Sequence, residues 1–247
     1  MSISSDLGYL YEKLMPKSLY PMALKSWYKK RTGYELDLSD PKTFNEKIQW
    51  IKLNYRDPLI SRLSDKYLVR EWISQQIGEE YLIPLLGVYD SFDEIDFDKL
   101  PDSFVMKANH GSGWNILVPD KAALDIGDAR KKFNKWLKMD FSFKYGYQLH
   151  YGDIKPRIVI EKLMLEKGHY PNDYKLLVLG GKARYIWIDS DRFTSHHRNV
   201  FDLNWNPAPF TLAYPTQQPS PARPVNLEKM TELAEKLGKD FNEVRVD

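Results

Sequence analysis

Residues 104–118 read FVMKANHGSGWNILV, and this stretch decides how the rest of the chain is interpreted. Two apolar runs flank the turn-forming residues 109–113, a pattern that predicts a β-hairpin. Glycines at the tip can take positive φ angles and leave the amide N–H groups uncovered. Lys107, at the end of the first run, can bring an ammonium group to an anion bound there. The stretch therefore predicts a phosphate-covering hairpin, and a hairpin whose glycines serve only the turn is the alternative.

Two familiar phosphate-binding motifs do not fit this stretch. A Walker loop ends in Gly-Lys-Ser/Thr and opens a helix, whereas residues 114–118 favour a strand that Pro119 ends. A protein kinase also carries a glycine-rich hairpin, but its lysine follows the loop. The chain contains neither His-Arg-Asp nor Asp-Phe-Gly.

The composition narrows the choice of partners. The 247 residues include 36 basic and 34 acidic side chains, so the net charge is only +2 and no nucleic-acid partner is expected. The absence of cysteine excludes disulfides, a thiolate nucleophile and Cys-ligated zinc. The sequence shows no secretory signal and no apolar run of about 18 residues. We therefore expect a cytoplasmic protein without a transmembrane segment.

The first hundred residues predict a mainly helical scaffold. Residues 7–31 show helical spacing, with Leu7, Leu10 and Tyr11 among the apolar positions, and end in a basic cluster. That cluster leaves a peripheral contact with the inner face of a membrane as an alternative to a packed helix. Thr43-x-x-Glu46 predicts a capped helix, and residues 64–77 predict a second one. The charged side chains of residues 56–70 are expected to form surface ion pairs.

The remainder predicts two α+β lobes, over residues 101–163 and 164–247. The smaller one combines the hairpin, a helix capped by Asp128 and a strand at residues 157–164, whose end at Glu161-Lys162 can expose backbone groups to an adenine edge. The larger one begins with two strands joined at Gly180-Gly181. It continues with a polar loop at 190–202, an extended connector at 206–224, a helix capped by Asn226 and a final strand at 244–247.

These pieces together resemble the ATP-grasp superfamily, and more closely its branch named for teichuronopeptide synthesis. The resemblance rests on KTFNEK at 42–47, DKY at 65–67, LIPLLGV at 82–88, KANHGSG at 107–113 and DSDR at 189–192. It implies the ATP-grasp fold, in which two α+β lobes clasp ATP, with Mg²⁺ as the metal. It also implies a ligase of cell-surface polysaccharide biosynthesis that joins an amino acid or amine to a sugar carboxylate through an acyl phosphate.

The same resemblance assigns roles to individual residues. It places Lys107 and Lys162 at the ATP phosphates and the hinge, Glu161 with Leu163 at the adenine hinge, and Asp173 at the ribose. It also implies a phosphate-covering loop of Gly111, Ser112 and Gly113, catalytic cations at Lys175, Arg198 and Arg245, and a magnesium ligand at Asp247. Such cations suit a transition state whose negative charge is spread over phosphoryl oxygens.

Two alternatives stay open beside the ligase. ATP-grasp ligases continue beyond the Arg-x-Asp strand to a second metal-binding strand, so we expect an incomplete large lobe, weak magnesium dependence and slow turnover or none. A non-catalytic ATP-binding remnant is then one alternative. A sugar-nucleotide glycosyltransferase is the other, and it rests on Asp189-Ser190-Asp191.

Overall fold

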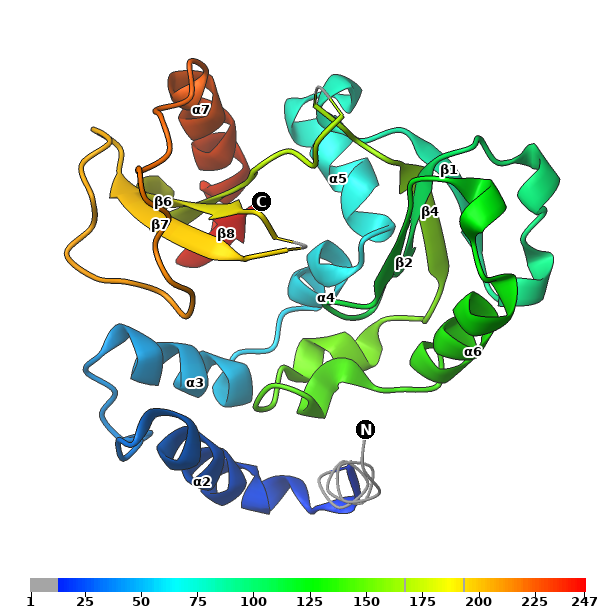
Figure 1. The fold of residues 1–247 in the computed structure, drawn as a ribbon. Coiled ribbons are helices and arrows are strands. Elements are labelled where there is room, and N and C mark those ends of the chain that lie inside the picture. Colours follow the sequence, from blue (N-terminus) through cyan, green and yellow to red (C-terminus); the bar gives the residue numbers. More distant parts are fainter. Residues whose placement is uncertain (1–12, 167, 193) are drawn as a thin grey trace. The chain divides into compact units, whose positions relative to one another are not determined.

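The computed structural model describes residues 13–166, 168–192 and 194–247, and the chain divides into two compact units. Unit 1 comprises residues 1–71 and 84–163, and unit 2 comprises residues 72–83 and 164–247. Each unit contains helices and a four-stranded antiparallel sheet (Figure 1). This confirms the predicted α+β class with a helical N-terminal segment. The predicted helical positions Leu7, Leu10 and Tyr11 lie outside the described residues.

Unit 1 begins with helices that pack on one another. The buried side of α2 (Tyr20–Thr32), with Tyr20, Leu24 and Tyr28, packs against Tyr147 and Leu149. The predicted capping box is present at the start of α3 (Phe44–Asn54), where Thr43 accepts a hydrogen bond from the N–H of Glu46. The other helices of this segment are η1 (Lys17–Leu19), α4 (Pro58–Ser64) and α5 (Leu68–Ile77), which runs into unit 2.

The helix predicted over residues 64–77 is in fact interrupted. Helix α4 ends at Ser64 and α5 begins at Leu68, so the first four residues of the predicted helix are not part of α5. The cause is the side chain of Asp65, whose Oδ1 accepts hydrogen bonds from the N–H groups of Tyr67 (2.8 Å) and Leu68 (3.3 Å). A short acidic side chain of this kind competes with the helical backbone and starts a new helix.

The sheet of unit 1 has the strand order β1-β4-β2-β3, and the predicted hairpin is β2 and β3. Helix α6 (Ile126–Trp136) covers one face, where its Phe133 lies in a core with Phe104, Met106 and Ile160. Its cap is Asp125, not the predicted Asp128, whose N–H donates to Asp125 at 2.8 Å. The four strands are β1 (Leu85–Tyr89), β2 (Phe104–Ala108), β3 (Asn115–Val118) and β4 (Ile158–Lys162).

Short 3-10 turns join these elements in unit 1, and one occurs in unit 2. They are η2 (Glu79–Tyr81) in unit 2 and, in unit 1, η3 (Phe92–Glu94), η4 (Phe97–Lys99), η5 (Lys121–Ala123), η6 (Phe141–Phe143) and η7 (Leu149–Asp153).

The sheet of unit 2 has the order β7-β6-β5-β8, and helix α7 (Leu227–Gly238) packs on one face through Leu227 and Ala234. Gly180 and Gly181 form the turn of the predicted hairpin, with φ angles of 56° and 74°. Asn226 precedes α7 as predicted, but its side chain makes no capping hydrogen bond. The strands are β5 (Asp173–Leu179), β6 (Lys182–Ser190), β7 (His197–Asp202) and β8 (Glu243–Val246).

The prediction of a loop over residues 190–202 is wrong for its second half. Residues 197–202 form β7, which pairs with β6 from Tyr185 to Ser190. Val200 and Phe201 favour a strand, but two adjacent apolar residues among polar neighbours are a weak signal. Pairing with β7 satisfies the backbone groups of the β6 edge. The following connector is tied to β7 by hydrogen bonds from Arg198 N–H to Pro215 O and from Ala208 N–H to Val200 O, both 2.9 Å. Among the described residues, no helix combines the length and apolarity needed to span a bilayer.

Candidate functional site

At the tip of the β2–β3 hairpin in unit 1, backbone N–H groups are not covered by side chains. The N–H groups of Gly111, Ser112 and Gly113 donate no hydrogen bond to another described residue. Gly113 has φ 74°, a conformation that side-chain-bearing residues rarely adopt. A Cβ at Gly111 would lie 2.5 Å from the ring of Trp114, so this position has room for glycine alone. The tip therefore offers several amide donors, as an anion-binding loop requires.

The base of this hairpin is held by buried polar side chains. Asn109 donates from Nδ2 to the carbonyl of Lys155 (2.9 Å) and accepts at Oδ1 from the N–H of Arg157 (2.6 Å). His110 lies 3.1 Å from the carbonyl of Trp136 through Nε2, and burial lowers the pKa of its imidazole. These bonds fix the backbone on which the tip is mounted.

A lysine that was expected to lie in a surface ion pair contacts the hairpin instead. Lys66 donates from Nζ to the carbonyl of Gly111, and its N–H donates to the carbonyl of Asn109 at 3.4 Å. Burial, followed by the charge of Lys107, lowers the pKa of Lys66 to about 8. Its neighbour Asp65 is only 1% exposed. The sequence signal for both was the DKY motif, whose contact partner lies more than forty residues away.

Glu161 joins two cations on the sheet face that α6 leaves uncovered. Its Oε2 lies 2.5 Å from Nζ of Lys107, and its Oε1 lies 2.7 Å from Nη1 of Arg70. Because Met106 and Ile160 face the α6 core, the alternation of β2 and β4 places Lys107 and Glu161 on the opposite face. Arg70 is thus a second site residue that was expected at the surface. With two cations against one carboxylate, this group carries a net charge of +1.

The structure does not bring every predicted unit 1 residue to this face. Lys162 is paired with Phe104 across the sheet, so it belongs to the same side as the α6 core and is exposed at the end of β4. Leu163 follows it and is buried. The backbone N–H of Lys162 already donates to the carbonyl of Pro84 at 3.0 Å.

In unit 2, three predicted residues lie together on one sheet face. Asp173 is directly opposite Asp189, and Asp189 is directly opposite Arg198. Lys175 is two residues from Asp173 on the same strand and forms ion pairs with both carboxylates, at 3.2 Å from Asp189. The α7 core occupies the other face through Leu176 and Ile188. The polar group is therefore on the face that α7 leaves free.

Asp189 is the centre of this group although it was not predicted as a site residue. Arg198 donates to it twice, from Nε to Oδ1 at 2.5 Å and from Nη2 to Oδ2 at 2.8 Å, and His196 Nε2 lies 3.0 Å from Oδ1. Burial alone would raise the pKa of Asp189, but hydrogen bonds from Arg198 and His196 and the charge of Lys175 hold it well below its usual value. Asp189 is therefore an ionised anchor for the cations around it.

Further side chains complete the unit 2 group. Arg192 donates to Asp173 at 2.6 Å, and the ring of Tyr214 lies 3.7 Å from that of His196 and 4.9 Å from the guanidinium of Arg198. The indole N–H of Trp187, on the strand position opposite Lys175, is buried and finds no acceptor among the described residues. A buried donor without an acceptor calls for an explanation, and a bound ligand or water is one.

Arg245, on the edge strand β8, and Asp247, which follows β8, lie at the edge of this sheet opposite to β7. Arg245 is directly opposite Leu177, whose side chain follows Lys175 on its face of β5, while Val244 and Val246 pack toward the α7 core. The guanidinium of Arg245 holds both oxygens of Asp247, one of them at 2.6 Å. The described residues contain no group of three His, Cys, Asp or Glu side chains that could hold a metal ion.

A model of the TupA-like ATP-grasp family matches residues 46–247 of the chain, which include every site residue described above. A search among curated proteins finds no match.

Proposed function

The chain belongs to the TupA-like ATP-grasp family, and from this premise we propose that it is an ATP-dependent carboxylate–amine ligase of cell-surface polysaccharide biosynthesis. In this reaction, a sugar carboxylate oxygen attacks the γ-phosphorus of ATP and ADP departs. An amino acid or amine then attacks the acyl carbon of the acyl phosphate, and inorganic phosphate departs. The reaction would take place in the cytoplasm, where ATP is supplied.

The observation that carries this proposal is the hairpin tip of unit 1. The three N–H groups of residues 111–113 have no acceptor in the described part of the chain, and Lys66 donates a hydrogen bond to the same tip. Lys107 is on the same hairpin, two positions before the buried Asn109. Amide donors combined with lysines are the chemistry that binds nucleotide phosphates. We therefore assign Gly111, Ser112, Gly113 and Lys107 to the phosphates, with Lys66 as an additional cation.

The sheet face of unit 2 opposite α7 would supply the catalytic cations. Lys175, Arg198 and Arg245 share this face, and Asp189 orients two of them. Negative charge that develops on phosphoryl and acyl oxygens is stabilised best by cations that are already oriented. Asp173, beside them, is the proposed ribose contact, and Glu161 with Lys162 and Leu163 of unit 1 is the proposed adenine hinge.

Magnesium would be held only loosely, because Asp247 is a single carboxylate and the described residues contain no group of three metal-ligating side chains. Mg²⁺ is usually held by one or two protein carboxylates, together with phosphate oxygens and water. Asp247 is such a carboxylate, and it would exchange the guanidinium of Arg245 for the ion. When bound, the ion would neutralise charge on the ATP phosphates.

The surroundings of Asp189-Ser190-Asp191 argue against the glycosyltransferase alternative. Such an enzyme would need the carboxylates of Asp189-Ser190-Asp191 to reach a metal-bound diphosphate. Both oxygens of Asp189 are instead engaged by Arg198, and the side chain is buried. Only Asp191 of the pair is exposed.

An assay of ADP release tests the proposal directly. The chain is incubated with ATP, Mg²⁺ and a panel of uronic acids paired with amino acids, and ADP is measured with each pair. Release that requires both a carboxylate and an amine supports the ligase. Binding of ATP without release for any pair would favour the non-catalytic remnant, and a response to UDP-sugars alone would favour the glycosyltransferase.

A further inference from the structure

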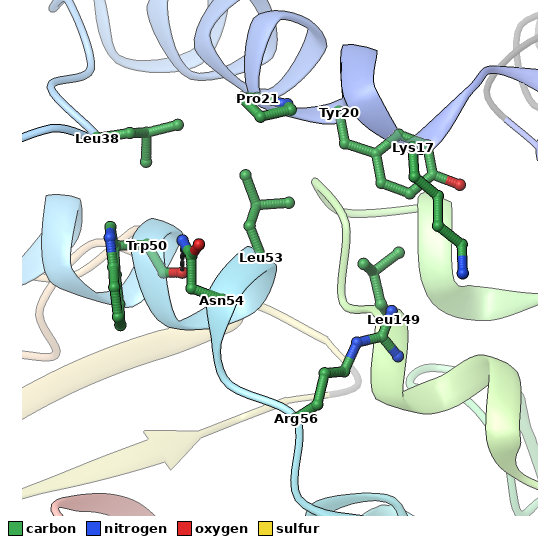
Figure 2. A pocket seen from close by; sticks show the side chains of 9 residues that line it. All are labelled: Lys17, Tyr20, Pro21, Leu38, Trp50, Leu53, Asn54, Arg56 and Leu149. Atoms are coloured by element: carbon green, nitrogen blue, oxygen red, sulfur yellow. Dashed lines mark hydrogen bonds between the residues drawn. The ribbon is translucent and has the colours of Figure 1, made fainter.

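A pocket lies in unit 1 among the N-terminal helices, away from the hairpin tip in the sequence. It has a volume of about 540 Å³ and is formed by η1, α2, α3 and η7 (Figure 2). The apolar part of its lining includes Tyr20, Leu53 and Leu149, and Trp50 also lines the pocket. This volume is within the range of small-molecule sites. The phosphate chemistry proposed above uses none of these residues.

The charged residues that line this pocket are both cations. Lys17 enters from η1 and Arg56 from the segment after α3. Arg56 forms one long ion pair, at 3.9 Å from Asp153, and Lys17 forms no ion pair with another described residue. No carboxylate is among the described residues that line the pocket. An anion is therefore the ligand that this lining favours.

The surroundings of the pocket are also positively charged. Burial and the charges of Lys52 and Arg56 lower the pKa of His150, which follows Leu149, to about 4. Residues 13–34 hold no acidic residue and six basic ones, namely Lys13, Lys17, Lys25, Lys29, Lys30 and Arg31. Of these, Lys29 is paired with Glu35. None of the other five forms an ion pair with a described residue.

Exposed apolar side chains accompany these cations. Leu14 is 74% exposed and Met22 is 63% exposed, and both belong to the segment that supplies Lys17 and Tyr20 to the pocket. A soluble anion would gain nothing from them, because they lie outside the pocket lining. Apolar side chains among lysines are typical of a protein surface that enters the headgroup region of an acidic bilayer.

We propose that residues 14–22 and this pocket bind an acidic phospholipid at a membrane surface, with Lys17 and Arg56 as partners of the lipid phosphate. Leu14 and Met22 enter the bilayer interface, and the apolar pocket lining receives the glycerol and upper acyl region. Such a contact would hold the protein beside membrane-bound substrates. It does not depend on the proposed ligase activity.

Vesicle sedimentation of the full chain, without nucleotide, tests this proposal. We expect binding to vesicles of phosphatidylcholine mixed with phosphatidylglycerol and little binding to phosphatidylcholine alone. The variant Lys17→Gln/Arg56→Gln should lower the partition coefficient roughly 30-fold, since each cation near an acidic surface contributes about fivefold. The matched variant Lys131→Gln/Lys135→Gln, which removes two exposed charges from α6, should leave the partition coefficient near its original value.

Three results would overturn the proposal. Equal binding to neutral and acidic vesicles would exclude recognition of an acidic headgroup. An equal fall in the partition coefficient of the two double variants would show that only the net charge of the protein matters. Calorimetric binding of glycerol 3-phosphate without vesicle binding would assign the pocket to a soluble phosphate ester. Because no ATP is present, failure of the ligase assay would leave these outcomes unchanged.

Discussion

The ammonium of Lys107 lies 2.5 Å from one carboxylate oxygen of Glu161, while Arg70 occupies the other oxygen at 2.7 Å. Glu161 is almost fully buried, and a buried charge is tolerated only when it is paired. Two cations on one carboxylate leave an excess positive charge. Lys107 can therefore turn to an incoming phosphate while Arg70 keeps Glu161 neutralised.

Replacement of Lys107 by Ala should weaken ATP binding. The lost charged hydrogen bond is worth roughly 1.5–3 kcal/mol, which corresponds to a roughly 10- to 150-fold rise in Kd. Isothermal titration with ATP measures this directly. Lys131→Ala, which removes an exposed lysine from α6, is the control and should keep the original Kd. An unaltered affinity in the Lys107 variant would mean that the hairpin does not bind the phosphates.

Replacement of Arg70 by Met should lower stability rather than nucleotide affinity alone. Glu161 would keep only Lys107, and we expect a loss of roughly 1–3 kcal/mol in the free energy of unfolding because a buried carboxylate loses one partner. Urea unfolding measures the loss. In a double-mutant cycle, Arg70→Met/Glu161→Gln should be less destabilised than the sum of the single variants. If the losses in unfolding free energy were strictly additive, the Arg70–Glu161 pair would contribute nothing to stability.

Asp189 should make unit 2 sensitive to acid. Its folded pKa is held below the unfolded value of about 3.9, so its stabilising contribution is complete above that pH and disappears as the pH falls further. Asp189→Asn should cost roughly 3–5 kcal/mol at neutral pH, since Lys175 and Arg198 lose their buried partner. The variant should also show a flatter decline of unfolding free energy below pH 4.

Urea unfolding at neutral and acidic pH checks this prediction. Asp240→Asn is the matched control, because it removes the same charge from a side chain that is 79% exposed. If both variants show the original acid dependence, Asp189 is not the group that titrates.

Local sequence patterns predicted the hairpins well, because apolar runs around 109–113 and Gly180-Gly181 identify both strands and turns. They also placed Asp173 beside Lys175, which are two positions apart on one strand. They did not reveal that Arg70 reaches Glu161, 91 residues away, or that Lys66 reaches the hairpin. Such contacts depend on how helices and strands pack, and the local pattern around a charged residue is the same at a surface and in a site.

ATP binding should depend on the protonation state of Lys66. Burial and the charge of Lys107 lower its pKa to about 8, so it is largely protonated at pH 7 and largely neutral at pH 9. A phosphate bound at the hairpin tip would favour the charged form and raise this pKa. ATP binding should therefore take up a proton above about pH 8, and the Kd should rise by up to about tenfold per pH unit there. Titrations in buffers of different ionisation enthalpy measure the proton uptake.

The variant Lys66→Gln separates this effect from general alkaline loss of binding. Glutamine can still donate a hydrogen bond to the carbonyl of Gly111 but does not titrate, so the tip keeps a partner while the charge is lost. We expect weaker ATP binding at pH 7 and no proton uptake above pH 8. If the variant retained the proton uptake, another group would be responsible for it. Lys66 would then support the hairpin without contacting a phosphate of ATP.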